Sequence, residues 1–597
     1  MAAALRILLL THSFNGLAQR LFAELGADGH AVSVEFDIAD SVTEEAVALF
    51  APDVIVAPFL KRAVPESIWR RHLTLIVHPG IVGDRGPSAL DWAIREGETA
   101  WGVTVLQAEA EMDAGPVWAS REFPLRAASK ADVYRNETTA GALAAVREAL
   151  ARVPEWRAGR WQPRALAHIP AARGRLRPLM RQAERALDWT RMGSAAILAR
   201  IRAADGFPGV ADALFGQPCH LFDAHPGRRP AGCEDAAPGT LLARRDGALL
   251  RATADGAVWI GHVRRADSPH PFKLPATLAF AAEVAEAAEA AALPELPATL
   301  MAPADADPAT LGYRELAYRE TDDGALGVLS FEFYNGAMST AQCRRLLAAI
   351  EFARGRPTHV LVLDGGAGFW SNGIHLNTIE AAPSPGDESW ANIEAIDDVC
   401  LALLGLTDRL TVAALRGNAG AGGCFLALAC DQVWARAGVV MNPHYKNMGN
   451  LFGSEYWTYL LPRRVGEDAA RAIMRNRLPL LAREAAAQGL IDDCFGADRV
   501  GFAAEVEARA RTLTDDPGLA ARIADKARRR AADEAERPLA AYRAAELDMM
   551  RRNFYGFDPS YHVARYHFVL KSPQSWTPRH LARHRELGWR APAASAA

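Results

Sequence analysis

The first eighty residues alternate short apolar runs with amphipathic stretches, and this alternation constrains the fold more than any other feature. The apolar runs RILLL, AVSVEF, DVIVAPF and LTLIV are rich in Val, Ile and Leu. Strands of this kind are buried on both faces, and helices between them imply right-handed βαβ units and a parallel sheet covered on both sides. Ligands bind at the carboxyl ends of such strands, so we expect a site in the loops that follow them.

The length of 597 residues requires several domains, because a single core rarely grows beyond about 250–300 residues. Short strands with Gly turns predict a small β-barrel, and a Pro/Ala-rich segment predicts a linker that contains one helix. A second α/β region then precedes an Arg-rich helical end. We therefore predict a multidomain α/β protein. Its expected parts are residues 1–170, a barrel module at 171–265, a linker at 266–312, an α/β domain at 313–516 and a helical extension at 517–597.

Composition excludes several classes of protein. The formal net charge of −4 is small for this length, so we expect no nucleic-acid partner. The seven cysteines form no C-x-x-C pair and no His/Cys cluster at zinc spacing, which predicts no metal site and a reduced, cytoplasmic setting. The apolar run at the N-terminus is too short to span a bilayer, so we expect a first strand rather than a signal peptide, and no membrane partner.

A motif in the first region indicates a chemistry. The segments HPGIVGDRGPSALDWAI, WGVTV and DAGPV follow one another over residues 75–118. In this order they resemble the folate-dependent formyltransferases, such as methionyl-tRNA formyltransferase. The resemblance implies a Rossmann-like domain, extends through the C-terminal barrel module of that family to about Arg265, and implies N10-formyl-tetrahydrofolate as the donor.

The same resemblance assigns residues to the transfer of the formyl group. It implies that His78 is the general acid and base, that Asp113 orients it, and that Arg85 and Gly86 belong to the loop that binds the folate. The Asn of the family falls at Ile76, so another donor must serve the formyl oxygen.

The loop THSFNG after the first predicted strand allows two interpretations. Ser13 and Asn15 stand at a strand-to-helix turn, where they are candidates for binding a phosphate of a cofactor. Alternatively, they are an ordinary helix cap, which is the more common use of these residue types.

A second group of motifs lies in the C-terminal half. FYNGAMSTAQCRRLL, GFWSNGIHLNTI, RGNAGAGGCFLALACD and LLPRRVGEDAARAI resemble the crotonase (enoyl-CoA hydratase/isomerase) superfamily over about residues 313–500. The resemblance implies a ββα spiral fold and coenzyme A as a ligand, with Asn372 and Gly373 in the binding loop. It also implies that the backbone amides of Ile374 and Gly422 form an oxyanion hole for a thioester oxygen.

The two water-activating glutamates of the hydratases are replaced, by Phe425 and His444. An apolar ring excludes water, so we do not expect hydration of an enoyl-CoA. We expect Tyr445 and Glu455 to act instead, because a carboxyl group among apolar residues has a raised pKa and exchanges a proton near neutral pH. Alternatively, Glu455 only complements the dipole of the helix that follows it.

The order of the two halves resembles the NiFe-hydrogenase maturation proteins of the HypX/HoxX type. The combination implies that a formyl group passes from N10-formyl-tetrahydrofolate to coenzyme A and that formyl-CoA is then decarbonylated, giving CO for the hydrogenase maturation machinery. A thiol suits this role because it ionises more readily than water. Two alternatives remain: a formyl-CoA hydrolase that releases formate, with His444 as the base, and a non-catalytic scaffold that binds folate and coenzyme A.

Overall fold

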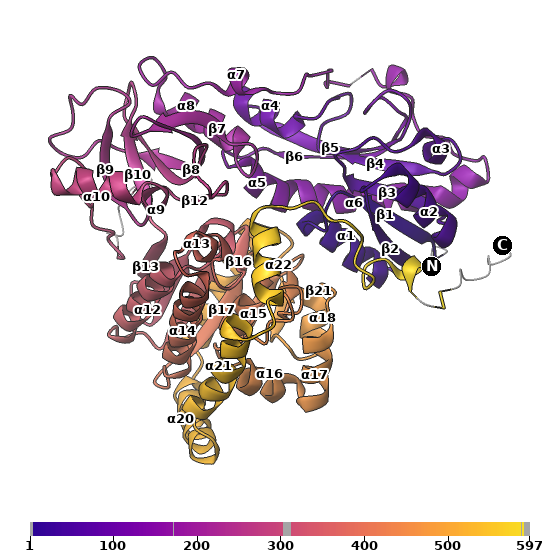
Figure 1. The fold of residues 1–597 in the computed structure, drawn as a ribbon. Helices are drawn as coiled ribbons and strands as arrows, with labels where there is room; N and C mark the ends of the chain where they lie inside the picture. The colour runs from indigo at the N-terminus through magenta and orange to yellow at the C-terminus, as the bar shows by residue number, and fades with distance from the viewer. Residues whose placement is uncertain (1–3, 171, 302–311, 587, 590–597) are drawn as a thin grey trace. The chain divides into compact units, whose positions relative to one another are not determined.

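The computed structural model describes residues 4–170, 172–301, 312–586 and 588–589 (Figure 1). The chain divides into two compact units. The first comprises Met1–Leu187, Ala199–Ala211 and Pro573–Ala597, and the second comprises Asp188–Leu198 and Asp212–Ser572.

The first unit is built on a six-stranded sheet with the order β2-β1-β3-β4-β5-β6. Its strands are β1 (Arg6–Thr11), β2 (Ala31–Phe36), β3 (Val54–Phe59), β4 (Thr74–His78), β5 (Ala100–Gln107) and β6 (Val117–Pro124). The strands β1 to β4 are parallel, as predicted, and the α/β fold class is confirmed. The strands β5 and β6 run antiparallel because a loop without a helix joins them, and such a loop cannot make a parallel crossover.

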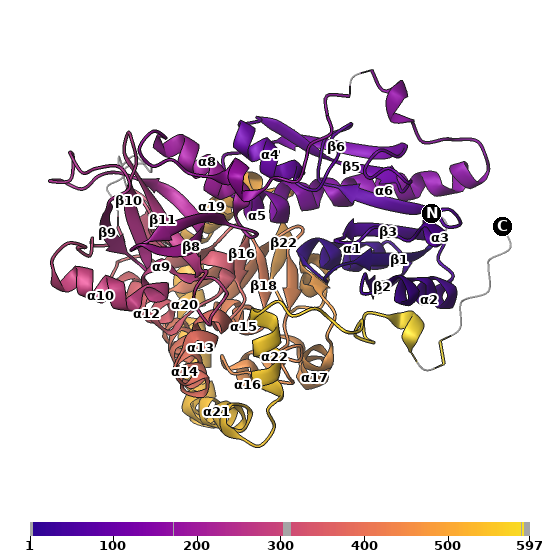
Figure 2. The ribbon, with the colours of Figure 1, turned by 45° about the horizontal axis from the view of Figure 1, so that its top comes forward.

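The first unit also contains helices, of which α1, α2 and α6 pack on the sheet. They are α1 (Gly16–Ala27), α2 (Asp40–Phe50), α3 (Glu66–Trp69), α4 (Ala89–Glu96), α5 (Lys130–Val133), the π-helix η1 (Tyr134–Thr138), α6 (Thr139–Arg157), η2 (Leu166–His168) and α7 (Gln182–Arg185). Helix α6 packs on β5 and β6, and α2 packs on β1 and β2 (Figure 2). The apolar run in the middle of β1 explains this covering, because Ile7, Leu8 and Leu9 have no exposed surface.

The end of the chain returns to this unit and lies beside β2. The amide of Val34 donates to the carbonyl of Leu581 at 3.0 Å, and the amide of Phe36 donates to Oγ1 of Thr577 at 2.8 Å. A short 3-10 helix, η4 (Arg583–Arg585), follows. The expected helical extension of residues 517–597 therefore ends before Pro573, because the last described residues bind the edge of a distant strand.

A buried glutamate of β2 holds this returning segment. Glu35 has no exposed surface and receives hydrogen bonds from Thr577, from His584 at 2.8 Å and from Arg585 at 2.8 Å. Burial alone would raise the pKa of Glu35, but the hydrogen bonds from these three residues outweigh it, and the pKa is lowered.

Most of the barrel module belongs to the second unit, and its residues Ala199–Ala211 belong to the first. Its strands are β7 (Val210–Leu214), β8 (Gln217–Gly227), β9 (Leu241–Arg245), β10 (Ala248–Ala252), β11 (Ala257–Arg265) and β12 (Leu274–Pro275), in the order β7-β8-β11-β10-β9 with β12 on β11. Its helices are α8 (Ser194–Ala204), α9 (Ala276–Ala279) and α10 (Ala281–Glu289).

The segment 266–312, predicted as a linker that contains one helix, has helices and also packs on the barrel module. Residues 274–289 form β12, α9 and α10, and the amide of Leu296 donates to the carbonyl of Arg244 at 2.9 Å. Apolar side chains such as Phe280 and Val284 are buried and fix this segment to the barrel, which composition alone did not indicate. Residues 302–311 lie outside the described residues.

Two sheets form the core of the C-terminal half. The first has the order β13-β14-β15-β17-β19-β22 and the second the order β16-β18-β20-β21. Their bounds are β13 (Leu316–Glu320), β14 (Leu326–Phe331), β15 (Val360–Gly365), β16 (Phe369–Ser371), β17 (Leu410–Leu415), β18 (Asn418–Gly420), β19 (Gln432–Arg436), β20 (Val440–Asn442), β21 (Leu480–Leu481) and β22 (Asp493–Phe495).

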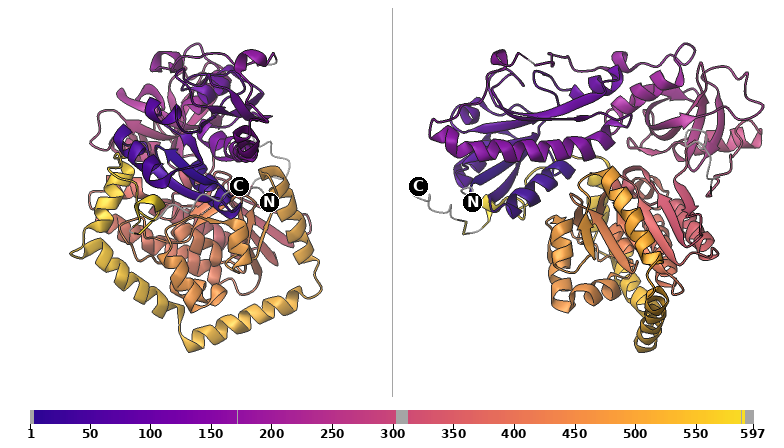
Figure 3. Two further views of the ribbon diagram at one scale, coloured as in Figure 1. Left: turned by 90° about the vertical axis from the view of Figure 1, so that its right-hand side faces the viewer. Right: turned by 180° about the vertical axis from the view of Figure 1, so that it is seen from behind.

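Helices surround these sheets, and α20 and α21 are two long helices at one end of the unit (Figure 3). The helices are η3 (Tyr334–Gly336), α12 (Thr340–Arg354), α13 (Leu376–Ala381), α14 (Pro385–Leu404), α15 (Gly422–Leu428), α16 (Trp457–Val465), α17 (Glu467–Arg475), α18 (Ala482–Ala487), α19 (Arg499–Thr514), α20 (Leu519–Glu536), α21 (Leu539–Tyr555) and α22 (Ser560–Val569). No helix of the described residues is long and apolar enough to cross a membrane.

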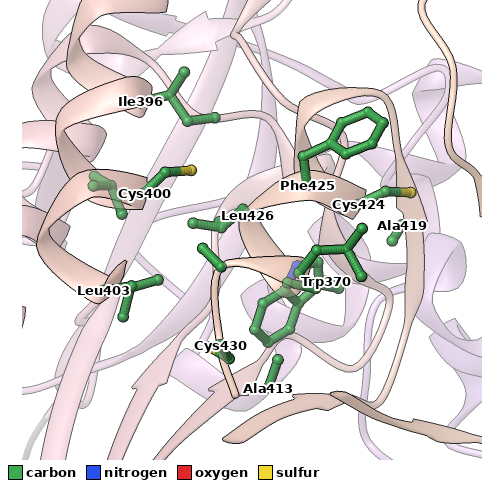
Figure 4. Packing of buried hydrophobic residues seen from close by; sticks show 14 of the residues in the cluster. Trp370, Ile396, Cys400, Leu403, Ala413, Ala419, Cys424, Phe425, Leu426 and Cys430 are labelled. Atoms are coloured by element: carbon green, nitrogen blue, oxygen red, sulfur yellow. The ribbon is translucent and has the colours of Figure 1, made fainter. Parts of the chain in front are cut away.

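Helix α15 lies inside the core and contributes Phe425 and Leu426, which have no exposed surface. Trp370 and Ile396 are buried beside it (Figure 4). A helix that is apolar all round must be enclosed on every side, and this explains the run CFLALAC in the sequence.

Candidate active site

The first candidate site lies where β4 ends, at His78. Its Nε2 atom is 2.9 Å from Oδ2 of Asp84, and its Nδ1 atom is 3.5 Å from Oδ2 of Asp113. All three side chains are largely buried. The structure thus brings the predicted pair His78 and Asp113 together and adds a second carboxylate, so a positive charge on the imidazole would be stabilised from both sides.

The backbone around His78 is shaped to allow the contact with Asp84. A Cβ atom on Gly80 would lie 2.5 Å from Nε2 of His78 and 2.6 Å from Oδ2 of Asp84, so only glycine fits at this position. Oγ1 of Thr104 donates to the carbonyl of Gly80 at 2.8 Å, and Nε1 of Trp101 donates to that of Pro79 at 2.9 Å. These bonds fix the loop to β5.

Asp113 is held from the predicted folate loop. Its backbone is left-handed, with φ of 56°, and its Oδ2 atom accepts a hydrogen bond from the amide of Gly86 at 3.1 Å. Arg85 forms an ion pair with Glu111 instead of facing His78 directly. Gly86 therefore orients the carboxylate, and Arg85 ties the loop to the neighbouring turn.

Asp84 is a residue that the sequence reasoning missed. Its Oδ1 atom is buried without a hydrogen-bond partner and lies 3.6 Å from Nε of Arg177, whose Nη1 atom binds Glu96 at 2.7 Å. The segment GDRG places this carboxylate one residue before the predicted folate-binding Arg85 and six residues after His78. That short spacing is the sequence feature that could have indicated a partner for His78.

Asn15 acts as a helix cap. Its Oδ1 atom accepts a hydrogen bond from the amide of Ala18 at 3.0 Å at the start of α1, and the carbonyl of Ser13 accepts from Oγ1 of Thr11 at 3.0 Å. The capping alternative therefore describes Asn15, and these bonds do not involve the hydroxyl of Ser13. These hydrogen bonds do not join Ser13 or Asn15 to His78.

The second candidate site is formed by two backbone turns. Gly373 has a left-handed φ of 77°, and a Cβ atom there would lie 3.3 Å from the amide nitrogen of Gly422, so the two predicted turns are adjacent. Among the described residues, no backbone acceptor is found for the amide of Ile374 or of Gly422. Asn372 supports the first turn, because its Nδ2 atom donates to the carbonyl of Asn335 at 2.9 Å.

The carboxyl group of Glu455 lies against the second turn. A Cβ atom on Gly422 would be 1.9 Å from Oε1 of Glu455, so the glycine leaves the space that the carboxyl group uses. The hydroxyl of Tyr445 donates to Oε2 of Glu455 at 2.5 Å. The four predicted residues Tyr445, Glu455, Ile374 and Gly422 thus gather around two adjacent turns.

Burial governs the protonation of this pair. Glu455 is 1 % exposed, and burial, together with the negative charge of Asp397, raises its pKa to about 8 against the weaker effect of the hydrogen bond from Tyr445. Burial and the Glu455 carboxylate also raise the pKa of Tyr445 well above its usual value. Tyr445 is therefore a neutral donor, while Glu455 exchanges a proton close to neutral pH.

Aromatic packing closes the site on the side where hydratases carry an acid. The ring of Phe425 stacks on that of Tyr445 with centroids 5.5 Å apart and planes at 16°. His444 is 5 % exposed. Phe425 thus fixes the orientation of the tyrosine that binds Glu455.

Three family models match the chain. "Formyl transferase" matches residues 34–150, "Formyl transferase, C-terminal domain" matches 179–270, and "Enoyl-CoA hydratase/isomerase" matches 332–578. Together they cover both candidate sites, so the two predicted domain types are confirmed.

Relatives and solved structures extend the likeness over the whole chain. The hydrogenase maturation factor HoxX of Bradyrhizobium diazoefficiens is 52 % identical over 581 residues, which is 97 % of each chain. A methionyl-tRNA formyltransferase of Roseiflexus castenholzii is 31 % identical over 191 residues, covering 32 % of this chain and 58 % of that protein. The crystal structure of HypX from Aquifex aeolicus in complex with tetrahydrofolic acid matches with a TM-score of 0.91 and 45 % identity, over 98 % of this chain and 100 % of that one. The chain belongs to the family of hydrogenase maturation factors that includes HoxX and HypX.

Proposed function

We propose that the chain transfers the formyl group of N10-formyl-tetrahydrofolate to coenzyme A at His78 and then decarbonylates formyl-CoA at Glu455, releasing CO for hydrogenase maturation. The observation that carries the proposal is the contact of the Glu455 carboxyl group with Gly422, beside the amides expected to bind a thioester oxygen. A group that exchanges a proton thus lies next to the polarised carbonyl.

The first reaction moves one formyl group and one proton. The thiol sulfur forms a bond with the formyl carbon, the bond from that carbon to N10 breaks, and the thiol proton passes to the leaving nitrogen. His78 carries this proton, because Asp84 and Asp113 stabilise the imidazolium that forms in between. A thiol suits this transfer because it ionises more readily than water. It therefore depends less on the side-chain amide of the family's Asn, which Ile76 replaces here.

The second reaction moves one proton from carbon to sulfur. Glu455 in its ionised form removes the formyl proton, the pair of electrons left on carbon becomes the lone pair of CO, and the bond to sulfur breaks. The amides of Ile374 and Gly422 stabilise negative charge on the oxygen, and protonated Glu455 returns the proton to the thiolate. No oxidant or reductant is needed.

Exclusion of water favours release of CO over release of formate. Phe425 has no exposed surface and stands where hydratases carry a water-activating glutamate. Since a dry site offers formyl-CoA no nucleophile, loss of the proton and expulsion of the thiolate is the remaining reaction.

The test incubates the protein with N10-formyl-tetrahydrofolate and coenzyme A, traps CO with haemoglobin and measures formate in the same sample. We expect CO in amounts equal to the tetrahydrofolate formed, and none without coenzyme A. Formate without CO would replace the proposal by a formyl-CoA hydrolase. Neither product, with both ligands bound equally by native protein and by His78→Ala and Glu455→Gln, would indicate a binding scaffold.

A further inference from the structure

The turn that carries Glu455 has an unusual backbone. Glu455 and Tyr456 have φ of 60° and 59°, a left-handed conformation that residues with a Cβ rarely adopt, and here two such residues are consecutive. Such strain persists only where surrounding groups hold it in place. Groups that pack around this turn must therefore hold it.

Two buried carboxyl groups hold it from different helices. Asp397 of α14 accepts hydrogen bonds from the amide of Glu455 at 2.7 Å and from Oγ of Ser454 at 2.8 Å. Glu546 of α21 accepts from the amide of Tyr456 at 2.9 Å. It also accepts from the amide of Thr458 at 2.8 Å and from the hydroxyl of that residue at 2.5 Å. Asp397 and Glu546 have no exposed surface.

The hydroxyl of Ser454 lies between these two carboxyl groups. Its Oγ atom is 2.8 Å from Oδ2 of Asp397 and 3.3 Å from Oε2 of Glu546. A hydroxyl has one proton, so it donates to only one of them. The other oxygen makes a favourable contact only if its carboxyl group is protonated and donates to Ser454. The geometry therefore favours one proton on Asp397 or Glu546.

We propose that Asp397 and Glu546 are positioning residues for Glu455: bridged by Ser454, they hold the left-handed turn that directs the carboxyl group at Gly422 and, by sharing one proton, limit the charge beside it. Neither residue touches substrate in this role. The inference rests on the proposed function for the meaning of Glu455, although the shared proton is independent of it.

The surrounding charges agree with a shared proton. The titratable groups that interact electrostatically with Glu455 are Tyr445, Asp397, Glu546, Cys343, Cys400 and Cys424. Asp397 faces the guanidinium of Arg543, whose Nε atom is 3.7 Å from it and whose Nη1 atom binds the half-exposed Asp398 at 2.7 Å. One guanidinium cannot neutralise three buried carboxylates.

The pKa values of Asp397 and Glu546 also agree with a shared proton. Burial raises the pKa of Asp397 to about 7 and that of Glu546 to about 8, against the hydrogen bonds that each accepts. Near neutral pH, at least part of this cluster is therefore protonated.

Infrared spectroscopy of the full chain, without any substrate, tests the shared proton. At pH 7 we expect absorbance of buried carboxylic acids that decreases in Asp397→Asn and in Glu546→Gln. Asp548→Asn is the matched control, since this exposed residue of α21 pairs only with Arg552. If native protein lacks such absorbance, or if both variants retain all of it, the shared proton is refuted, whether or not CO is formed.

The pH dependence of CO release from added formyl-CoA tests the positioning role. The reaction needs ionised Glu455, so its rate rises with pH, and removing a neighbouring carboxylate by Asp397→Asn shifts that rise to lower pH by about one unit. A merely structural role would lower the rate at every pH without moving the curve, and that result overturns the proposal. Should Asp397→Asn not fold, Ser454→Ala removes the bridge and must shift the curve as well.

Discussion

Glu35 and Glu455 are both glutamates with almost no exposed surface, yet their pKa values move in opposite directions. Glu35 receives hydrogen bonds from a histidine, a threonine and an arginine, and its pKa is lowered. Glu455 has a tyrosine, one amide and two further acids around it, and its pKa rises to about 8. Burial alone therefore does not decide the state of an acid. The groups that surround it do, and they separate a structural clamp from a group suited to proton transfer.

The sharpest way to break this comparison is Glu455→Gln. We expect the rate of CO release from formyl-CoA to fall about a thousandfold, because the amide cannot remove the formyl proton. Binding of coenzyme A, measured by calorimetry, should remain. The exposed Glu505→Gln on α19 is the control and should keep the native rate. A variant with full CO release would show that the raised pKa of Glu455 has no part in the reaction.

Glu35→Gln should lower the stability of the first unit and leave CO release unchanged, which is the reverse of the result expected for Glu455→Gln. Loss of this carboxylate leaves the buried His584 and the partly buried Arg585 beside a neutral amide, so the free energy of unfolding of the first unit should fall by about 3 kcal/mol. CO release from supplied formyl-CoA should be unchanged. Chemical denaturation followed by hydrogen exchange in β2 measures the effect, with Glu45→Gln, the exposed partner of Arg585, as the control. Equal stability of both variants would contradict the clamp.

The sequence indicated one of these glutamates and not the other, for a physical reason. Glu455 follows recognisable turns in a motif, and the apolar residues around it predicted a raised pKa. Glu35 owes its role to Thr577, His584 and Arg585, which are more than five hundred positions away in the sequence. A local sequence pattern cannot predict partners that are so distant along the chain.

The same reason explains what was found and missed at the two candidate sites. His78 and Asp113 belong to ordered motifs, as do Ile374 and Gly422, so all four were predicted. Asp397 and Glu546 lie on helices whose hydrophobic pattern predicts only that the helices are packed against a core. It does not predict that these two acids contact Glu455. The strand and helix alternation likewise predicted β1 to β4, whereas the buried side chains that fold residues 274–289 onto the barrel are hidden in a Pro/Ala-rich segment.

The comparison also predicts opposite effects of pH on stability in the two regions. A carboxyl group with a raised pKa, such as Glu455, contributes stability that is complete below its unfolded value of about 4.3 and is lost as the pH rises through about 8. Each proton kept only in the folded state changes the free energy of unfolding by about 1.4 kcal/mol per pH unit. Glu35, with a lowered pKa, contributes stability that is present above the unfolded value and is lost as the pH falls through the folded one.

Hydrogen exchange at pH 5.5 and pH 8, corrected for the intrinsic rates, separates these effects by segment. Between these values we expect α14 and α16 to lose protection as the pH rises, because Asp397, Glu455 and Glu546 then lose their protons. A third measurement at pH 3.5, below the unfolded value of about 4.3, should show loss of protection in β2, because Glu35 has a lowered pKa. Glu35→Gln should remove this acid sensitivity of β2 and leave α14 unaffected. A uniform response of both regions would show that the cluster does not control local stability.

The smallest effect is expected at His78, which two carboxylates flank. Gly80→Ala places a Cβ atom 2.5 Å from Nε2 of His78, which must move away from Asp84. We expect formyl transfer to coenzyme A to slow about tenfold, which is a loss of about 1.4 kcal/mol of transition-state stabilisation. CO release from supplied formyl-CoA should stay native. Gly26→Ala is the matched control, because a Cβ atom there meets nothing within 4 Å. An unchanged transfer rate in Gly80→Ala would mean that the second carboxylate is only a structural partner of the imidazole, and the balance of charge around His78 would then rest on Asp113 alone.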